Sequence, residues 1–146
     1  MATDGKRKIF MQSMVGMVIE GLATADVRPG SIVEQSASGI AESNDIDAIF
    51  NQQTLFADYD QLGAGDVDTV IASGSTVLAC PLPKGCAANV LVNSLQNITK
   101  KGMGLAPAGN GTLKLAAADG TDKVVAYSDE IINTGGSVTL VKVKGA

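Results

Sequence analysis

Short runs of small apolar residues, separated by turn-forming residues, recur along most of the chain. From Val27 onward the runs are rich in β-branched side chains and bounded by Gly, Pro, Asn or Asp, a pattern typical of strands. Alternation is strictest near the end, where Val141 and Val143 should point inward and Lys142 and Lys144 outward. We therefore predict a mainly β fold, a small barrel or sandwich with a loop-rich middle.

The turn signals divide this region into individual strands. The predicted strands cover 31–34, 67–72, 75–80, 88–95, 112–118, 123–127 and 138–144. Ser73-Gly74 and Asp119-Gly120 each predict a hairpin between the strands on either side, while Ser38-Gly39 should end the first strand before a polar loop. Caps at 43–45 and apolar positions on one face predict a short helix near 45–53.

The first 26 residues differ from the rest because they are rich in Met and lack strand alternation. Residues 6–25 begin with basic residues and end with small ones, as a secretory signal does, but Gln12, Ser13 and Glu20 interrupt the apolar stretch and argue against export. The stretch also falls short of the roughly 20 apolar residues that cross a membrane. We therefore divide the chain into an N-terminal interaction arm, 1–26, and a β-rich domain, 27–146.

The arm presents apolar side chains on several sides, so something must cover them. The cover is either the protein's own core or another subunit, whose irregular grooves suit flexible Met side chains. The candidate partner-binding residues are Ile9, Phe10, Met11, Met14, Met17, Val18 and Leu22.

Composition argues against most catalytic and nucleic-acid functions. The chain has no histidine, the commonest proton-transfer residue near neutral pH, and its formal charge of −4 disfavours nucleic acid as a partner. Eight acidic and no basic residues lie between Arg28 and Lys84, forming either solvated faces or a surface complementary to a neighbouring copy. The composition thus predicts a protein that is not an enzyme.

The remaining candidate chemistry is weak. Cys80 and Cys86 match no zinc or redox spacing, so they are free thiols or, alternatively, a disulfide. The paired carboxylates Asp45-x-Asp47, Asp58-x-Asp60 and Asp66-x-Asp68 lack the spacing of a calcium loop. We expect no metal and no cofactor.

Three stretches together resemble the capsid decoration, or cement, proteins of tailed bacteriophages. They are VRPGSIVE (27–34), KKGMGLAPAGNGTLKLA (100–116) and KVVAYSDEIINTGGSVTLVKV (123–143). The resemblance covers roughly residues 27–146 and is one of pattern rather than of a signature motif.

The resemblance implies a non-enzymatic viral structural protein on the outside of the virion. Such proteins are small, β-rich and commonly trimeric, and they bind the major capsid protein and stabilise contacts between its subunits. Many extend an N-terminal arm over neighbouring subunits, a role that 1–26 would fill. The partners expected here are the major capsid protein and copies of the chain itself, with neither nucleic acid nor membrane. The alternative is an exported β-rich module that binds a glycan or another surface.

Overall fold

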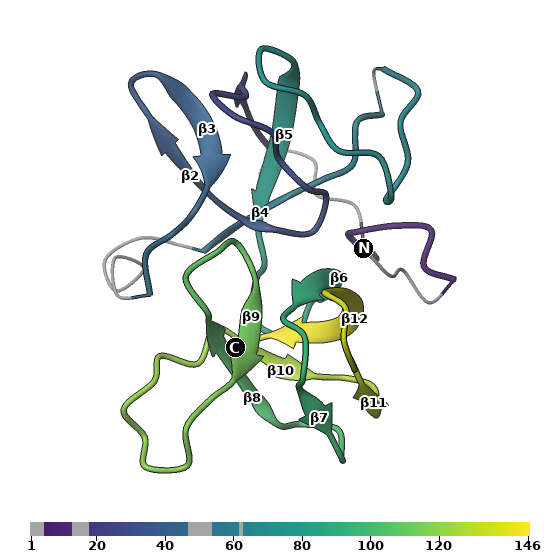
Figure 1. The fold of residues 1–146 in the computed structure, drawn as a ribbon, viewed down its shortest axis with the longest axis vertical. Coiled ribbons are helices and arrows are strands. Elements are labelled where there is room, and N and C mark those ends of the chain that lie inside the picture. The colour runs from purple at the N-terminus through teal and green to yellow at the C-terminus, as the bar shows by residue number, and fades with distance from the viewer. Residues whose placement is uncertain (1–4, 13–17, 47–53, 62) are drawn as a thin grey trace.

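A computed structural model describes residues 5–12, 18–46, 54–61 and 63–146 of the 146-residue chain. These residues form strands and loops and no helix, which confirms the mainly β prediction. The strands make two lobes, a curved sheet from 19–81 and a closed barrel from 82–146 (Figure 1). The helix predicted near 45–53 falls almost entirely on 47–53, outside the described residues.

The sheet lobe contains five antiparallel strands in the order β1-β5-β4-β2-β3. Their bounds are Ile19–Leu22 (β1), Ile32–Ser36 (β2), Gly39–Glu42 (β3), Leu55–Ala57 (β4) and Thr76–Pro81 (β5). The two edge strands approach each other, because Ala23 forms a parallel bridge with Ile40 and the Thr24 amide donates to the Ile40 carbonyl at 2.9 Å. The sheet is therefore curled almost into a second barrel.

The barrel lobe closes through five strands in the order β10-β12-β6-β9-β8. Their bounds are Ala87–Val92 (β6), Gly104–Pro107 (β8), Leu113–Leu115 (β9), Ala126–Ser128 (β10) and Thr139–Gly145 (β12). One pair is parallel, β6 with β9, and the other neighbouring pairs are antiparallel. A separate two-stranded ribbon joins Asn97–Ile98 (β7) to Ile132–Asn133 (β11).

Each lobe has its own apolar core. Val27, Val33, Ile40, Val77 and other small side chains fill the curled sheet. The barrel core is built from β6, β8, β9, β10 and β12, and it extends into the sheet lobe through Ile32, Phe56 and Cys80. Those three residues form one row across β2, β4 and β5, because Ile32 pairs with Phe56 and Phe56 with Cys80. The outer face of the sheet thus packs on the barrel.

The final strand follows its predicted alternation. Val141 and Val143 are fully buried, while Lys142 is partly exposed and Lys144 exposed. The strand covers Thr139–Gly145, one residue later at each end than predicted.

Four other predictions of strands and turns were wrong. Residues 67–72 form no strand, since only Ile71 pairs, with Val27, and the preceding chain is turned by hydrogen bonds to Asp66. The hairpin predicted at Ser73-Gly74 therefore does not form, and β5 pairs with β1 and β4 instead. Ser38-Gly39 leads into β3 rather than a polar loop. The turn at Asp119-Gly120 forms, but the strands beside it do not pair with each other.

Strand β8 separates the two strands of that expected hairpin. Both β9 and β10 pair with β8, whose Gly104 lies so close to Val124 and Ala116 that a Cβ would stand 3.0 and 3.7 Å from their side chains. The glycine-rich approach to β8 lets this strand enter between them.

Candidate partner-binding surface

The seven candidate partner-binding residues lie in different environments. Ile9 and Phe10 are buried in the barrel core, and Met11, Val18 and Leu22 are exposed. Met14 and Met17 fall outside the described residues. The protein's own core therefore covers Ile9 and Phe10, and partner binding remains a prediction for the three exposed residues.

Residues 8–11 are held against the barrel by the backbone and side chain of Asn89. The Asn89 amide donates to the Ile9 carbonyl at 2.6 Å, and its side-chain Nδ2 donates to the Lys8 carbonyl at 2.7 Å. The Met11 amide donates to the Ala87 carbonyl at 3.1 Å. This part of the predicted arm is thus a short extension of the barrel at β6, and β1 likewise belongs to the sheet lobe.

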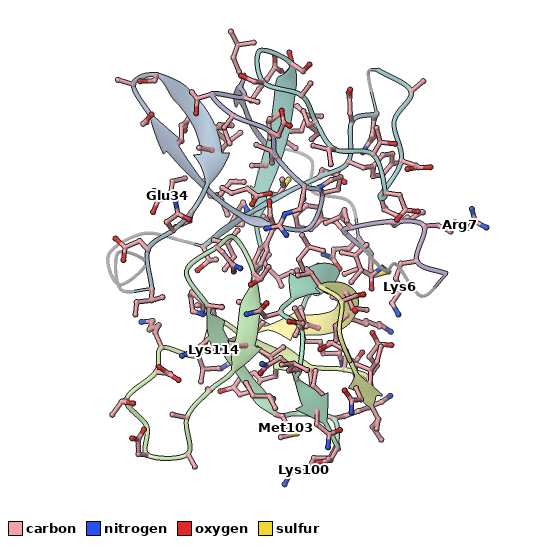
Figure 2. All side chains as sticks on the ribbon, viewed as in Figure 1. Lys6, Arg7, Glu34, Lys100, Met103 and Lys114 are labelled. Atoms are coloured by element: carbon pink, nitrogen blue, oxygen red, sulfur yellow. The ribbon has the colours of Figure 1, made fainter. Side chains whose placement is uncertain are left out.

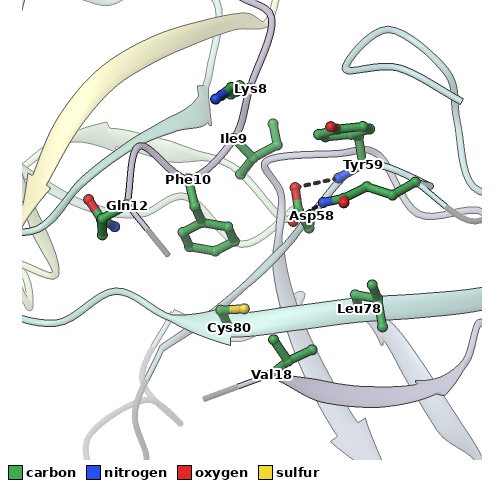
Figure 3. A pocket seen from close by; sticks show the side chains of 10 residues that line it. Lys8, Ile9, Phe10, Gln12, Val18, Asp58, Tyr59, Leu78 and Cys80 are labelled. Carbon is green, nitrogen blue, oxygen red and sulfur yellow. Dashed lines mark hydrogen bonds between the residues drawn. The ribbon is translucent and has the colours of Figure 1, made fainter. Parts of the chain in front are cut away.

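A cavity of about 430 Å³ lies between residues 8–12, the loop after β4 and strand β5 (Figure 3). Its lining is mixed: Lys8, Ile9, Phe10, Gln12, Val18, Asp58, Tyr59, Gln61, Leu78 and Cys80. Candidate residues Ile9, Phe10 and Val18 meet here, whereas Met11 and Leu22 lie elsewhere.

Asp58 and Cys80 are the two cavity residues whose pKa is raised. Burial raises the pKa of Asp58, although its carboxylate accepts hydrogen bonds from the Tyr59 amide and from Gln61 Nε2, both at 2.9 Å. Burial, and secondarily the Asp58 charge, raises the pKa of the Cys80 thiol to about 11. A protonated thiol is a poor nucleophile, so the cavity offers little for covalent chemistry.

The cysteines are not bonded to each other: Cys80 is buried and Cys86 half-buried. Among the described residues no three His, Cys, Asp or Glu side chains gather as a metal site would require. The carboxylates of Asp60 and Asp66 instead accept hydrogen bonds from the loop itself, from the Gly63 amide and from the Asp68 amide and Thr69 hydroxyl.

The outer face of β1 presents exposed apolar side chains. Val18, which directly precedes β1, alternates with the outward-facing Glu20 and Leu22, and Val18 is exposed by 47% and Leu22 by 58% of their surface. Glu20 pairs with Leu78 and Leu22 with Thr76, so these side chains share a face with Cys80 two residues along β5. The face that packs on the barrel at Phe56 and Cys80 therefore continues across β1, where Val18 and Leu22 are exposed.

Two further exposed apolar side chains flank the β7–β11 ribbon of the barrel lobe. Leu95 is 80% exposed and Ile131 67% exposed, at opposite ends of the paired residues. Leu95 has a φ of 61°, rare for a residue with a Cβ, and its amide donates to the Gly135 carbonyl at 2.7 Å. The backbone thus holds an apolar side chain in solvent at some conformational cost.

Charge is divided between the lobes. Residues 18–81 carry ten acidic side chains and only Arg28 as a basic one, whereas residues 82–146 carry seven lysines and four acidic side chains. Figure 2 labels Glu34 on the sheet lobe and Lys100 and Lys114 on the barrel. The formal charges are −9 and +3, so the molecule has an acidic and a basic end.

Sequence reasoning did not single out Leu95, Ile131 or Tyr127 as surface residues, and it named Asp58 only as one of the paired carboxylates, not as a cavity residue. For Lys144 the sequence did predict an exposed position, because the alternation of the last strand points its side chain outward. The positions of the others depend on which strands pair, and short apolar runs do not encode that pairing.

Comparison with known proteins leaves the chain without an assigned family. It matches no protein-family model and no curated protein. Within the described part of the chain, no helix has the length and apolar character needed to cross a membrane.

Proposed function

We propose that this protein is a non-enzymatic structural component of a virus particle, a capsid decoration protein on the shell exterior. In this role it binds the major capsid protein and copies of itself, and so strengthens contacts between shell subunits. The pattern of residues 27–146 that resembles tailed-phage decoration proteins suggests the viral setting.

The observation that carries the proposal is the presence of exposed apolar side chains in two separate regions of one small chain. A protein that joins two bodies needs two such surfaces, and large exposed apolar side chains mark sites of protein contact. One surface is the outer face of β1, with Val18 and Leu22, and the other is the β7–β11 ribbon, with Leu95 and Ile131. We assign the ribbon to the shell, because its exposed position and flanking Lys100 and Lys101 suit an acidic surface.

The protonated Cys80 thiol in the cavity also suits a structural role. The sequence has no histidine, and the buried Cys80 thiol holds its proton to about pH 11. Many copies on a shell gain avidity, so each contact can be modest.

The test begins with particles purified from the source of the sequence. Mass spectrometry and cryo-electron microscopy should find the chain in many ordered copies on the exterior, with the β7–β11 ribbon facing the shell. A Leu95→Ser/Ile131→Ser variant should co-sediment with undecorated shells at least about tenfold more weakly than the wild type. A Leu22→Ser variant is the matched control and should bind single shell sites normally.

Two results would overturn the proposal. The first is absence of the protein from every particle, which would turn attention to an exported module that binds a glycan. The second is wild-type binding by the ribbon variant, which would remove the ribbon from the shell contact.

A further inference from the structure

We infer that copies of this chain associate head to tail, with the outer face of β1 in one copy against the outer face of β10 and β12 in the next. The inference rests on the proposed function for the expectation that copies meet. It is measured on the isolated protein, so its failure and the failure of shell binding are separate results.

The first half of the contact is the β1 face described above. It presents an acidic side chain, Glu20, between two exposed apolar ones, Val18 and Leu22. The neighbouring strand β5, residues 76–81, contains no acidic or basic side chain. A partner for this face therefore needs one positive charge next to apolar or aromatic surface.

The second half lies in the barrel lobe and has that chemistry. Tyr127 of β10 pairs with Lys144 of β12, so their side chains stand next to each other on the outer face, and Tyr127 is 45% exposed.

Lys144 is the lysine of this face that is available for a partner. Lys142, two residues before it, is held by Asp129 at 3.3 Å. Among the described residues no carboxylate lies within ion-pair distance of Lys144. An ammonium group and an aromatic ring thus face solvent together, matching Glu20 and its apolar neighbours.

The charge of the lobes selects this arrangement over its alternatives. Sheet lobe against sheet lobe would bring two bodies of charge −9 together, and barrel against barrel two of charge +3. Only the head-to-tail contact joins opposite charges. Because its two surfaces differ, the contact is heterologous, and repetition closes a ring when the rotation between copies allows it.

The experiment combines cross-linking with charge exchange. A carbodiimide forms an amide bond between a carboxylate and an amine in contact, with loss of water, so it should join Glu20 to Lys144. In an equal mixture of ¹⁴N and ¹⁵N protein, half of these cross-linked peptides should be isotopically mixed, as an intermolecular contact requires. A cross-link found only within one isotope would overturn the inference.

Sedimentation of three variants tests the charges. Glu20→Lys and Lys144→Glu should each weaken self-association at least about tenfold at low salt, because each places like charges in contact. The double variant Glu20→Lys/Lys144→Glu restores the opposite pair and should recover association. The control exchange Asp68→Lys/Lys123→Glu uses exposed residues outside both faces and should associate like the wild type.

Each contrary outcome is decisive. A wild-type protein that stays monomeric at every concentration and at low salt overturns the inference. So does a double variant that fails to recover while remaining folded by circular dichroism, since a contact between identical faces would leave like charges opposed after the exchange.

Discussion

Arg28 and Glu42 form a double ion pair that also reaches the opposite lobe. Arg28 Nε and Nη2 donate to the two carboxylate oxygens at 2.9 and 2.8 Å, and the Arg28 amide donates to Oε1 at 2.8 Å. Nη2 also donates to the Asn110 carbonyl at 2.7 Å, in the loop between β8 and β9. The pair therefore fastens the sheet lobe to the barrel, and its hydrogen bond to Glu42 raises the pKa of Arg28.

Replacing Arg28 should loosen this attachment. Arg28→Met leaves Glu42 partly buried without its two guanidinium hydrogen bonds and removes the bond to Asn110, so we expect a loss of about 2 kcal/mol in the free energy of unfolding. Urea denaturation measures it. The control is Lys114→Met, whose more exposed pair with Asp122 should contribute less than about 1 kcal/mol. Equal losses in the two variants would contradict the special role of Arg28.

A second prediction concerns the closure of the sheet lobe at Gly39. This residue has a φ of 138°, and a Cβ would stand 2.2 Å from the Leu22 carbonyl oxygen. Gly39→Ala should therefore destabilise the protein by about 2 kcal/mol or more. Gly74 is the control: its φ is 86°, but an added Cβ would meet nothing within 4 Å. Gly74→Ala therefore measures the cost of the backbone conformation alone, about 1 kcal/mol. A Gly39 variant no less stable than the Gly74 variant would refute the close approach of β1 and β3.

The contribution of Asp58 to stability should fall as the pH rises, whereas that of a salt-bridged carboxylate rises. Because burial raises its pKa in the folded protein, its contribution to stability is present below the unfolded value near pH 3.9 and is lost as the pH rises through the folded pKa. Asp58→Asn cannot ionise, so its stability relative to wild type should rise between about pH 3.5 and pH 7. Partial solvation limits the gain to less than about 1 kcal/mol.

Asp119 supplies the control for this profile. Hydrogen bonds from the Thr121 hydroxyl and amide lower the pKa of the exposed Asp119, so its contribution is present above the unfolded pKa and lost as the pH falls. Asp119→Asn should therefore lose stability relative to wild type over the same rise in pH. Thermal unfolding at a series of pH values distinguishes the two, and parallel profiles would show the Asp58 assignment to be wrong.

The fourth prediction is unequal reactivity of the two thiols. Cys80 is buried and its pKa is about 11, so at pH 8 iodoacetamide should modify Cys86 in the native protein and both residues only after denaturation. Intact-mass spectrometry should show one added group on native chains. Cys86→Ser should then take up none. Rapid double labelling, or a native mass two hydrogens short, would rule out the arrangement described here.

The β class and the last strand were predictable because they depend on local pattern. Alternation from Thr139 to Gly145 reports which side chains face the core whatever strand lies alongside. Pairing was not predictable in the same way. The turn at Asp119-Gly120 forms as its sequence demands, yet β8 lies between the strands on either side, and nothing within 112–127 encodes that third strand.

The N-terminal residues show the same limit. The apolar character of these residues predicted that part of the protein or a partner must cover them. It did not predict which of the side chains the protein's own core would bury. Asn89 decides this for Ile9, and the two lie 80 positions apart in the sequence. The exposed state of Val18 and Leu22 follows from the pairing of β1 with β5, which is equally remote from local pattern.

The barrel is assembled from both ends of the chain, and this arrangement affects how the protein is made. Phe10 bridges Ala88 and Lys6 binds Glu130 at 3.0 Å, so the whole sheet lobe is inserted between two parts of one structural unit. During synthesis residues 5–81 leave the ribosome before residues 82–146. The strands of the sheet lobe can therefore pair with one another while residues 5–12 still lack Ala88 and Glu130, their partners in the barrel. Closing so long a loop is slow. We therefore expect a folding intermediate with a formed sheet lobe and an open barrel.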